Sequence, residues 1–317
     1  MTEDSFIAAL RSFATHPAAR GLVDDVAVLD VGGAALVLTH DMVVEGLHFL
    51  PDDAAVDVAW KLVAVNMSDL AAKGATPLGV LMGAGLARGE AWAADFADGL
   101  AAALRHFAVP LLGGDTVVMP RDWPVTLGLT AIGRAPSGGA PSRAGARAGD
   151  DLWVSGTIGD AGLGLMMRQG RLQGGASSLV QAYTHPAPDL ALGRALAPLV
   201  TAMADVSDGL LIDAGRIASA SGIGITVALD AVPLSEAWRE VRGDGAEERV
   251  AAATMGDDHR LLFTAPPERA VAILAAGMRH GAALTRVGGC GAGQGLRLSY
   301  NGTPTSLPAR LGYVHGE

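Results

Sequence analysis

Aspartates stand beside predicted strands and helices at well-separated points of the chain. Asp41 follows the apolar segment 35–39, and Asp205 and Asp208 flank Ser207 where a strand gives way to a helix. Any one of them could simply cap a helix or lie in a solvated turn. Together they match the way an α/β fold gathers carboxylates at one edge of a sheet. Such oxygen ligands suit Mg²⁺, which usually bridges carboxylates to substrate phosphates.

A further acid, Asp69, stands where an apolar residue is expected. The helix predicted over 54–73 has an apolar stripe of Val58, Leu62 and Val65, and Asp69 is the next position on it. An ionised acid on a buried face is unfavourable unless a cation or dense hydrogen bonding compensates. Taken alone, the position fits equally well a frayed helix end where Asp69 meets water.

A possible phosphate-binding turn follows the predicted strand 109–112, with the sequence Gly113-Gly114-Asp115-Thr116. Paired glycines let backbone N–H groups approach phosphate oxygens, and the acid could hold a metal beside them. The chain contains neither a Walker A motif nor the glycine loop and lysine of protein kinases. ATP chemistry here would therefore need a different scaffold.

Composition limits the classes of function. The 317 residues carry a formal net charge of −10, which disfavours nucleic-acid binding because phosphate backbones need basic surfaces. A polyanion such as ATP would need a cation, for which Mg²⁺ is the simplest candidate. The longest apolar run, at about 78–87, is shorter than the ~20 residues that cross a bilayer. We therefore expect no membrane association.

The chain beginning and its cysteine content indicate a cytoplasmic protein. The first five residues carry no positive charge of the kind that opens a signal peptide. The single cysteine, Cys290, excludes a disulfide within the chain and suits a reducing compartment. No histidine motif accompanies Cys290, so we interpret it as an incidental thiol rather than a nucleophile.

Strand and helix signals alternate through both halves, which predicts the α/β (or α+β) class with two domains. Strands are expected at 26–29, 35–39, 78–86, 109–112, 125–133, 152–155, 225–229, 260–264 and 283–287. Helices are expected at 4–13, 54–73, 90–106, 160–169, 189–203, 208–221 and 267–280. The segment 136–149 is rich in Gly, Pro, Ser and Ala, so we place the boundary there, between domains 1–136 and 137–317.

Eight motifs, in order along nearly the whole chain, match one enzyme family. They are DDVAV at 24–28, THDMVVEGLHF at 39–49, KLVAVNMSDLAAKG at 61–74, GGDT at 113–116, SRAG at 142–145, VSGTIGD at 154–160, DVSDGL at 205–210 and GDD at 256–258. On these motifs the chain resembles thiamine-monophosphate kinase. The resemblance implies the fold of aminoimidazole-ribonucleotide synthetase, with an N-terminal domain that dimerises through its sheet and ATP bound with several Mg²⁺ ions between two domains. The implied reaction is direct in-line transfer from ATP to thiamine phosphate.

The resemblance also implies roles for individual residues. Mg²⁺ ligands would come from Asp25, Thr39, His40, Asp41, Asp69, Asp115, Asp205 and Asp208. ATP would contact Gly114, Asp115, Arg143 and Ser207, and thiamine phosphate would contact His48 and Asp257. Among these, the chemical step would depend most on Asp115, Asp208 and Arg143. Such roles agree with phosphoryl transfer, in which catalysis is mainly positioning and charge neutralisation.

Departures from the family pattern fall mostly on the acceptor side. His40 replaces a Ser or Thr, His259 and Arg260 replace Tyr and an acid, and Arg310, with Tyr313 nearby, stands where an aromatic residue is common. Two alternatives therefore stay open: an enzyme of the same superfamily with another acceptor, and a nucleotide-binding protein of weak turnover. Selenophosphate synthetase is disfavoured, because its N-terminal Cys or selenocysteine and Lys are not seen here.

Overall fold

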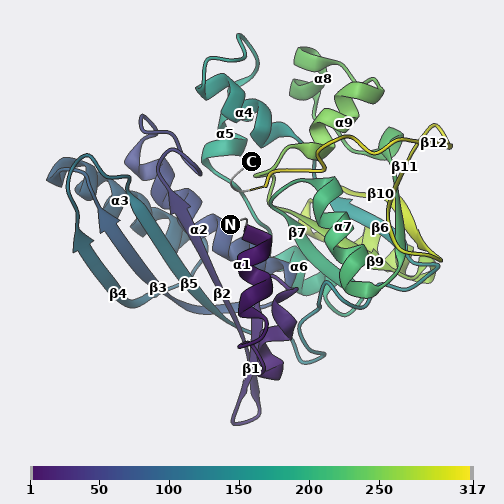
Figure 1. The fold of residues 1–317 in the computed structure, drawn as a ribbon, viewed down its shortest axis with the longest axis horizontal. Helices are drawn as coiled ribbons and strands as arrows, with labels where there is room; N and C mark the ends of the chain where they lie inside the picture. Colours follow the sequence, from purple (N-terminus) through teal and green to yellow (C-terminus); the bar gives the residue numbers. More distant parts are fainter. Residues whose placement is uncertain (1–2, 315–317) are drawn as a thin grey trace.

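The computed structural model describes residues 3–314, which form two sheets with helices packed against them (Figure 1). The N-terminal sheet has the order β1-β2-β5-β3-β4. Its strands are β1 (Ala27–Val31), β2 (Ala34–Val44), β3 (Thr76–Leu86), β4 (Leu111–Val118) and β5 (Thr126–Arg134). The helices of this half are α1 (Glu3–Leu10), α2 (Ala55–Ala72) and α3 (Glu90–His106). All pairs in this sheet are antiparallel except β3 with β4.

The second half contains a seven-stranded sheet of order β12-β11-β8-β10-β6-β9-β7. Its strands are β6 (Asp151–Ser155), β7 (Ala202–Val206), β8 (Gly224–Ala228), β9 (Arg260–Ala265), β10 (Leu284–Gly291), β11 (Gly295–Tyr300) and β12 (Thr303–Thr305). Its α-helices are α4 (Asp160–Arg168), α5 (Ser177–Thr184), α6 (Leu190–Leu196), α7 (Leu210–Ser221), α8 (Glu236–Arg242), α9 (Ala246–Thr254) and α10 (Ala270–His280). This mixed arrangement confirms the predicted α/β (α+β) class.

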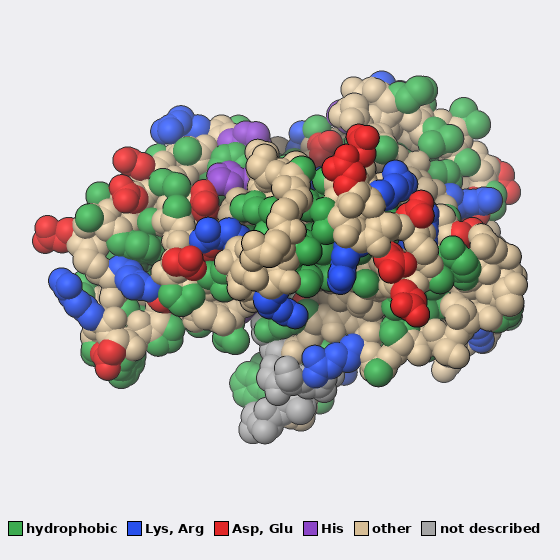
Figure 2. Space-filling model, turned by 90° about the horizontal axis from the view of Figure 1, so that it is seen from above, with side chains coloured by type: hydrophobic (Ala, Val, Ile, Leu, Met, Phe, Trp, Pro, Cys, Tyr) green, Lys and Arg blue, Asp and Glu red, His purple; other side chains and the backbone are tan. Residues whose placement is uncertain are grey.

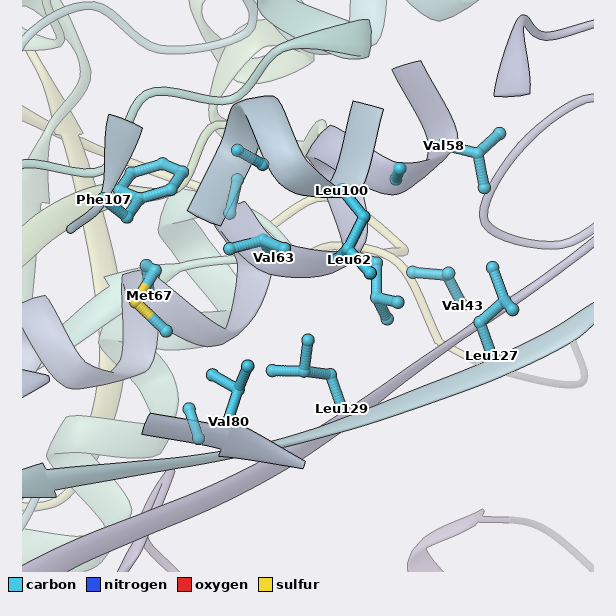
Figure 3. Packing of buried hydrophobic residues seen from close by; sticks show 14 of the residues in the cluster. Val43, Val58, Leu62, Val63, Met67, Val80, Leu100, Phe107, Leu127 and Leu129 are labelled. Atoms are coloured by element: carbon cyan, nitrogen blue, oxygen red, sulfur yellow. The ribbon is translucent and has the colours of Figure 1, made fainter. Parts of the chain in front are cut away.

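Helix α2 packs against both halves of the molecule. Leu62, Val63 and Met67 belong to the hydrophobic cluster formed by α2, α3 and the N-terminal sheet (Figure 3). Ala71 and Ala72, at its C-terminal end, belong to a cluster that also contains residues of the second half. All residues from 61 to 72 are buried. Every polar side chain in this stretch must therefore find a partner inside the protein.

Several predicted elements are confirmed, whereas one predicted helix and one predicted turn are wrong. The helix at 90–106 has the predicted limits, and α2 differs by one residue at each end. The helix predicted over 189–203 ends at Leu196, and Ala202–Val206 is the buried strand β7. Pro198 cannot donate the backbone hydrogen bond that a continuing helix needs, and β7 gains its bonds from β9 instead.

The predicted turn at Gly113-Gly114 is also wrong, because both glycines lie inside β4. A Cβ atom on Gly114 would lie 1.8 Å from the Met82 carbonyl oxygen. Glycine at this position therefore allows β4 to approach β3 closely, a role in strand pairing that the motif alone does not reveal.

On the face shown in Figure 2, acidic and basic side chains are interspersed among apolar ones rather than gathered in one basic surface. Among the helices described, none has both the length and the apolar character that crossing a membrane requires.

The contact between α2 and α6 gives a test of the packing between the two halves. A Cβ atom on Gly193 of α6 would lie 2.0 Å from the Ala71 carbonyl oxygen, so Gly193→Ala should lower the free energy of unfolding by about 1–3 kcal/mol. Gly215 of α7 is a matched control, because a Cβ atom there meets nothing within 4 Å. Gly215→Ala should stabilise by up to about 1 kcal/mol. Equal effects of both changes in urea unfolding would contradict this packing.

Candidate active site

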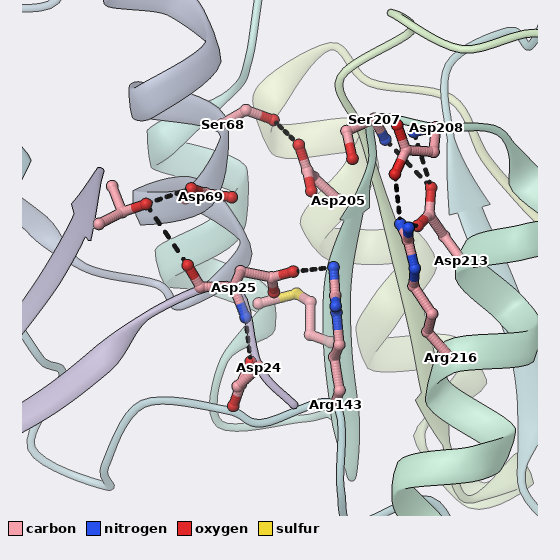
Figure 4. Close-up of polar contacts among 12 residues, drawn as sticks. Asp24, Asp25, Ser68, Asp69, Arg143, Asp205, Ser207, Asp208, Asp213 and Arg216 are labelled. Atoms are coloured by element: carbon pink, nitrogen blue, oxygen red, sulfur yellow. Dashed lines mark hydrogen bonds and ion pairs between the residues drawn. The ribbon is translucent and has the colours of Figure 1, made fainter. Parts of the chain in front are cut away.

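Three aspartates from distant segments meet between the two halves. Asp25 precedes β1, Asp69 lies near the end of α2, and Asp205 lies on β7. One carboxylate oxygen from each lies within 4.8 Å of the others (Figure 4). The cluster therefore forms only when the N-terminal and C-terminal sheets are both in place.

Burial and mutual repulsion disfavour full ionisation of this cluster. Burial, and then the charges of Asp41 and Asp205, raise the pKa of Asp69 well above its usual value. Burial and the Asp205 charge raise the pKa of Asp41 to about 6. Cations close to the carboxylates would relieve this repulsion.

Hydroxyl groups orient two of the carboxylates. Thr39 of β2 donates a hydrogen bond to Oδ2 of Asp69. Ser68 donates to Oδ2 of Asp205 at 2.6 Å, and Nδ1 of His259 lies 3.4 Å from the same oxygen. Burial opposes ionisation of Asp205, but the bonds and charge of His259 outweigh it and lower the pKa. One oxygen of each carboxylate is thus held by the protein.

Buried Lys73 connects the acids to the second half of the molecule. Its Nζ lies 2.6 Å from Oδ1 of Asp24, contacts Oδ2 of Asp25 and donates to the Met203 carbonyl of β7 at 3.0 Å. Arg20 adds an ion pair to Asp24 at 2.6 Å. Burial opposes ionisation of Asp24, but Lys73 and Arg20 hold its pKa below the usual range. Sequence analysis did not identify Lys73, because its partners are distant in the chain.

Arg143 extends over the cluster from the segment before β6. Its guanidinium contacts Oδ1 of Asp25 (Figure 4), and its backbone carbonyl accepts a hydrogen bond from Ser221 at 3.0 Å. A guanidinium held in this place presents a fixed positive charge to any phosphate group that binds beside Asp25.

The donor set fits a divalent cation. The Asp25 side chain is 2% exposed. Its carboxylate oxygens contact the charged ends of Lys73 and Arg143, but neither oxygen accepts a well-oriented hydrogen bond from the described residues. Asp69 and Asp205 each supply a further carboxylate within reach. Several carboxylate oxygens in one small volume are what Mg²⁺ prefers.

The turn between β7 and α7 is organised by a buried acid that sequence analysis missed. Oδ2 of Asp213 accepts the backbone N–H groups of Ser207 and Asp208, at 3.1 and 3.2 Å, and also that of Gly209. Arg216 bridges Oδ1 of Asp213 and Oδ2 of Asp208, at 2.7 and 2.6 Å (Figure 4). The i, i+3 spacing of Asp213 and Arg216 on a predicted helix was the available signal. Ser207 and Asp208 are therefore fixed beside the acids.

The two residues expected to contact thiamine phosphate, His48 and Asp257, meet at Lys61 of α2. Nζ of Lys61 donates to the His48 carbonyl at 2.9 Å and to Oδ2 of Asp257 at 2.8 Å. Asp257 and His259 both have positive φ, at 68° and 48°, which is strained for residues other than glycine. Backbone bonds from these residues to Ser207 and Val206 help to hold that conformation.

Three residues expected at the site lie elsewhere within one chain. His40 alternates with Thr39 along β2, so its side chain lies on the opposite face of the sheet, where Nδ1 is 2.8 Å from Oγ1 of Thr130. Gly114 is three strands away from Asp41 in the same row, about 14 Å at the usual strand spacing. Asp115 follows it on the face that carries His40. One chain therefore does not bring Asp115 or His40 to the acidic cluster.

The sequence matches two family descriptions. Residues 23–135 match the AIR synthase related protein, N-terminal domain, and residues 147–301 match the C-terminal domain. The thiamine-monophosphate kinase of Caulobacter vibrioides is 40% identical over 306 residues, which cover 95% of this chain and 86% of that protein. The Escherichia coli K12 enzyme is 37% identical, over 93% of this chain and 91% of that protein. The chain belongs to the thiamine-monophosphate kinase family.

Solved thiamine-monophosphate kinases share its fold. The Stenotrophomonas maltophilia enzyme superimposes with a TM-score of 0.77 at 35% identity, over 95% of this chain and 96% of that one. The structure of AaThiL complexed with AMPPCP and TMP superimposes with a TM-score of 0.85 at 26% identity, over 99% of this chain and 97% of that one. Similarity over both halves supports the whole family arrangement rather than one shared domain.

Asp258 gives a test by pH. Its Oδ2 accepts the Gly159 N–H at 2.8 Å, and burial raises its pKa from 3.8 to about 7. Between these values the unfolded chain loses the proton while the folded chain keeps it, so this group stabilises the fold less as pH rises from about 4 to 7. Asp258→Asn keeps an acceptor without the proton. Its stability relative to the parent should therefore rise by about 2–3 kcal/mol between pH 5 and 8 in urea unfolding. Identical pH profiles for the two proteins would contradict the assignment.

Proposed function

We propose that this protein is an Mg²⁺-dependent kinase that transfers the γ-phosphate of ATP to the phosphate of thiamine phosphate, giving ADP and thiamine diphosphate. The observation that carries the proposal is the meeting of Asp25, Asp69 and Asp205 at the junction of the two halves. Membership of the thiamine-monophosphate kinase family supports the acceptor. The family relative AaThiL was solved with AMPPCP and TMP bound.

The side chains have separable parts in this reaction. Asp25, Asp69 and Asp205 would hold Mg²⁺, with Asp41 and Asp208 beside them. Bound Mg²⁺ neutralises phosphate charge and draws two anionic substrates together.

Arg143 would steady the phosphates through its fixed guanidinium, and the turn at Ser207 would lie against the nucleotide. An oxygen of the acceptor phosphate attacks the γ-phosphorus, and the bond from that phosphorus to the bridging oxygen of ADP breaks.

The function is tested by ADP release in a coupled assay with ATP and Mg²⁺. We expect release only when thiamine phosphate is added, with thiamine diphosphate as the product identified by mass spectrometry. Asp205→Asn should reduce turnover by at least about a hundredfold, because one carboxylate of the cluster is neutralised. Release that does not depend on thiamine phosphate would favour another acceptor, and ATP binding without turnover would favour a nucleotide-binding protein.

A homodimer formed through the N-terminal sheet is part of the proposal. Strand β4 lies at the edge of the sheet, and all of its residues are exposed in the single chain. The sheet face opposite α2 carries exposed apolar side chains, with Met42, Leu81 and Val117 between 42% and 56% exposed. An apolar face beside an unpaired edge is a typical protein–protein contact surface. Because one chain leaves Asp115 away from its own acids, the proposal includes that Asp115 of a second copy on this face completes the site of the first.

Shared sites predict that inactive variants restore each other. In co-expressed Asp69→Asn and Asp115→Asn chains, half of the dimers are mixed, and one of the two sites in each mixed dimer has both acids. Activity should therefore recover to about a quarter of the parent value. Asp69 and Asp205 belong to the same chain's cluster, so Asp69→Asn with Asp205→Asn is the matched control and should stay inactive. No recovery in the first pair would place Asp115 in the site of its own chain or outside the site.

A further inference from the structure

Lys61 is a buried lysine whose ammonium group is surrounded by partners within the protein. Its side chain is 5% exposed. Nζ donates to the His48 carbonyl at 2.9 Å and to Oδ2 of Asp257 at 2.8 Å, and it lies 4.1 Å from the centre of the Tyr183 ring. An ammonium carries three hydrogens, and three partners surround this one. Lys61 is therefore poorly placed to bind a phosphate itself.

The partners of Lys61 come from both halves of the molecule. His48 follows β2 of the N-terminal sheet, whereas Asp257 precedes β9 of the second sheet. These are the same two residues that the family resemblance places against thiamine phosphate. Lys61 thus fixes the separation between them through one atom.

The Asp257 carboxylate is held at Oδ2 by Lys61, and its Oδ1 lies 3.9 Å from Nε2 of His259. Lys61 binds Oδ2, while the side chain as a whole is 35% exposed. The backbone of Asp257 is strained at a φ of 68°, and its N–H donates to the Ser207 carbonyl at 2.7 Å. Burial opposes ionisation of Asp257, but Lys61 lowers its pKa, so the group stays anionic. The exposed part of this carboxylate suits a cationic ligand.

We propose that Lys61 is a positioning residue for the acceptor site, which holds His48 and Asp257 in register so that the carboxylate of Asp257 faces the positively charged part of the acceptor. The thiazolium ring gives thiamine phosphate such a charge. The proposal rests on the proposed function for the identity of the acceptor. It assigns to Lys61 an indirect role, through Asp257, rather than direct contact with either substrate.

A supporting network keeps the Lys61 ammonium in place. The buried Tyr183 hydroxyl donates to Oδ2 of Asp53 at 3.0 Å. Oδ1 of the same aspartate accepts from Nε of Arg168 at 3.0 Å. The ring is therefore fixed against the ammonium, where a cation–π contact offsets part of the lost hydration. Asp53 serves this network rather than capping α2, whose N-cap residue is Ala54.

The test compares Lys61→Met, Asp257→Asn and the double variant. Lys61→Met keeps most of the apolar stem but removes the charge, so KM for thiamine phosphate should rise by at least about tenfold. KM for ATP should stay within about twofold, because the metal-binding acids are untouched. In the Asp257→Asn background the same change should have a clearly smaller effect, since no charge remains to be oriented. Arg242→Met removes a positive charge at an exposed position of α8 and is the control, with an expected KM close to that of the parent.

Equal changes in the KM of both substrates, or fully additive effects in the double variant, would overturn the positioning role. If Lys61→Met fails to fold by circular dichroism, Lys61→Gln carries the same comparison, because it keeps a donor for the His48 carbonyl without the charge. Thiamine phosphate binding followed by tryptophan fluorescence, without ATP, gives a readout independent of turnover. The parent protein alone tests the proposed function, because absence of ADP release that depends on thiamine phosphate would refute this acceptor. A different pattern among the variants would refute only the positioning role of Lys61.

Discussion

Three carboxylates, those of Asp25, Asp69 and Asp205, share one small buried volume, and the surrounding structure depends on offsetting their repulsion. Lys73 and Arg143 supply fixed positive charge on one side, and hydroxyl groups orient individual oxygens. The oxygens that remain suit a divalent cation. The negative charge of the three carboxylates is thus offset partly by the protein and partly by its expected ligands, which fits a site for two phosphate-bearing substrates.

Helix α2 links this constraint to the rest of the fold. It carries Ser68, Asp69 and, just after its end, Lys73 at the acidic cluster, and it carries Lys61 at the acceptor side. Positions 61 and 73 are separated by about 18 Å along a helix axis. One rigid element therefore spaces the metal-binding acids from the residues proposed to hold the acceptor. The burial of its residues 61–72 explains why each polar side chain in that stretch pairs with a group of another segment.

Local signals in the sequence were reliable where the pattern and the packing agree. The helix at 90–106 has a clear apolar face, and its predicted limits are confirmed. Asp69 stood out because it interrupts an apolar stripe, and it is indeed buried. The helix predicted over 189–203 failed because Ala202–Val206 is buried throughout and apolar except for Asp205, a pattern that fits a buried strand as well as a helix. Its pairing with β9 decides between them, and that partner lies more than 50 residues away.

By itself the sequence determined the class of fold, the family and the acids able to bind a metal, since these depend on residue types and short spacings. Tertiary structure alone decided which of those acids meet. Asp41 and His40 are neighbours in the chain but lie on opposite faces of β2, and Asp115 lies on the far edge of the sheet. The partners of Lys61 and Lys73 were also invisible in the sequence. The physical reason is that ion pairs and strand pairing join segments far apart in the chain, and no local pattern records which distant group will satisfy a buried charge.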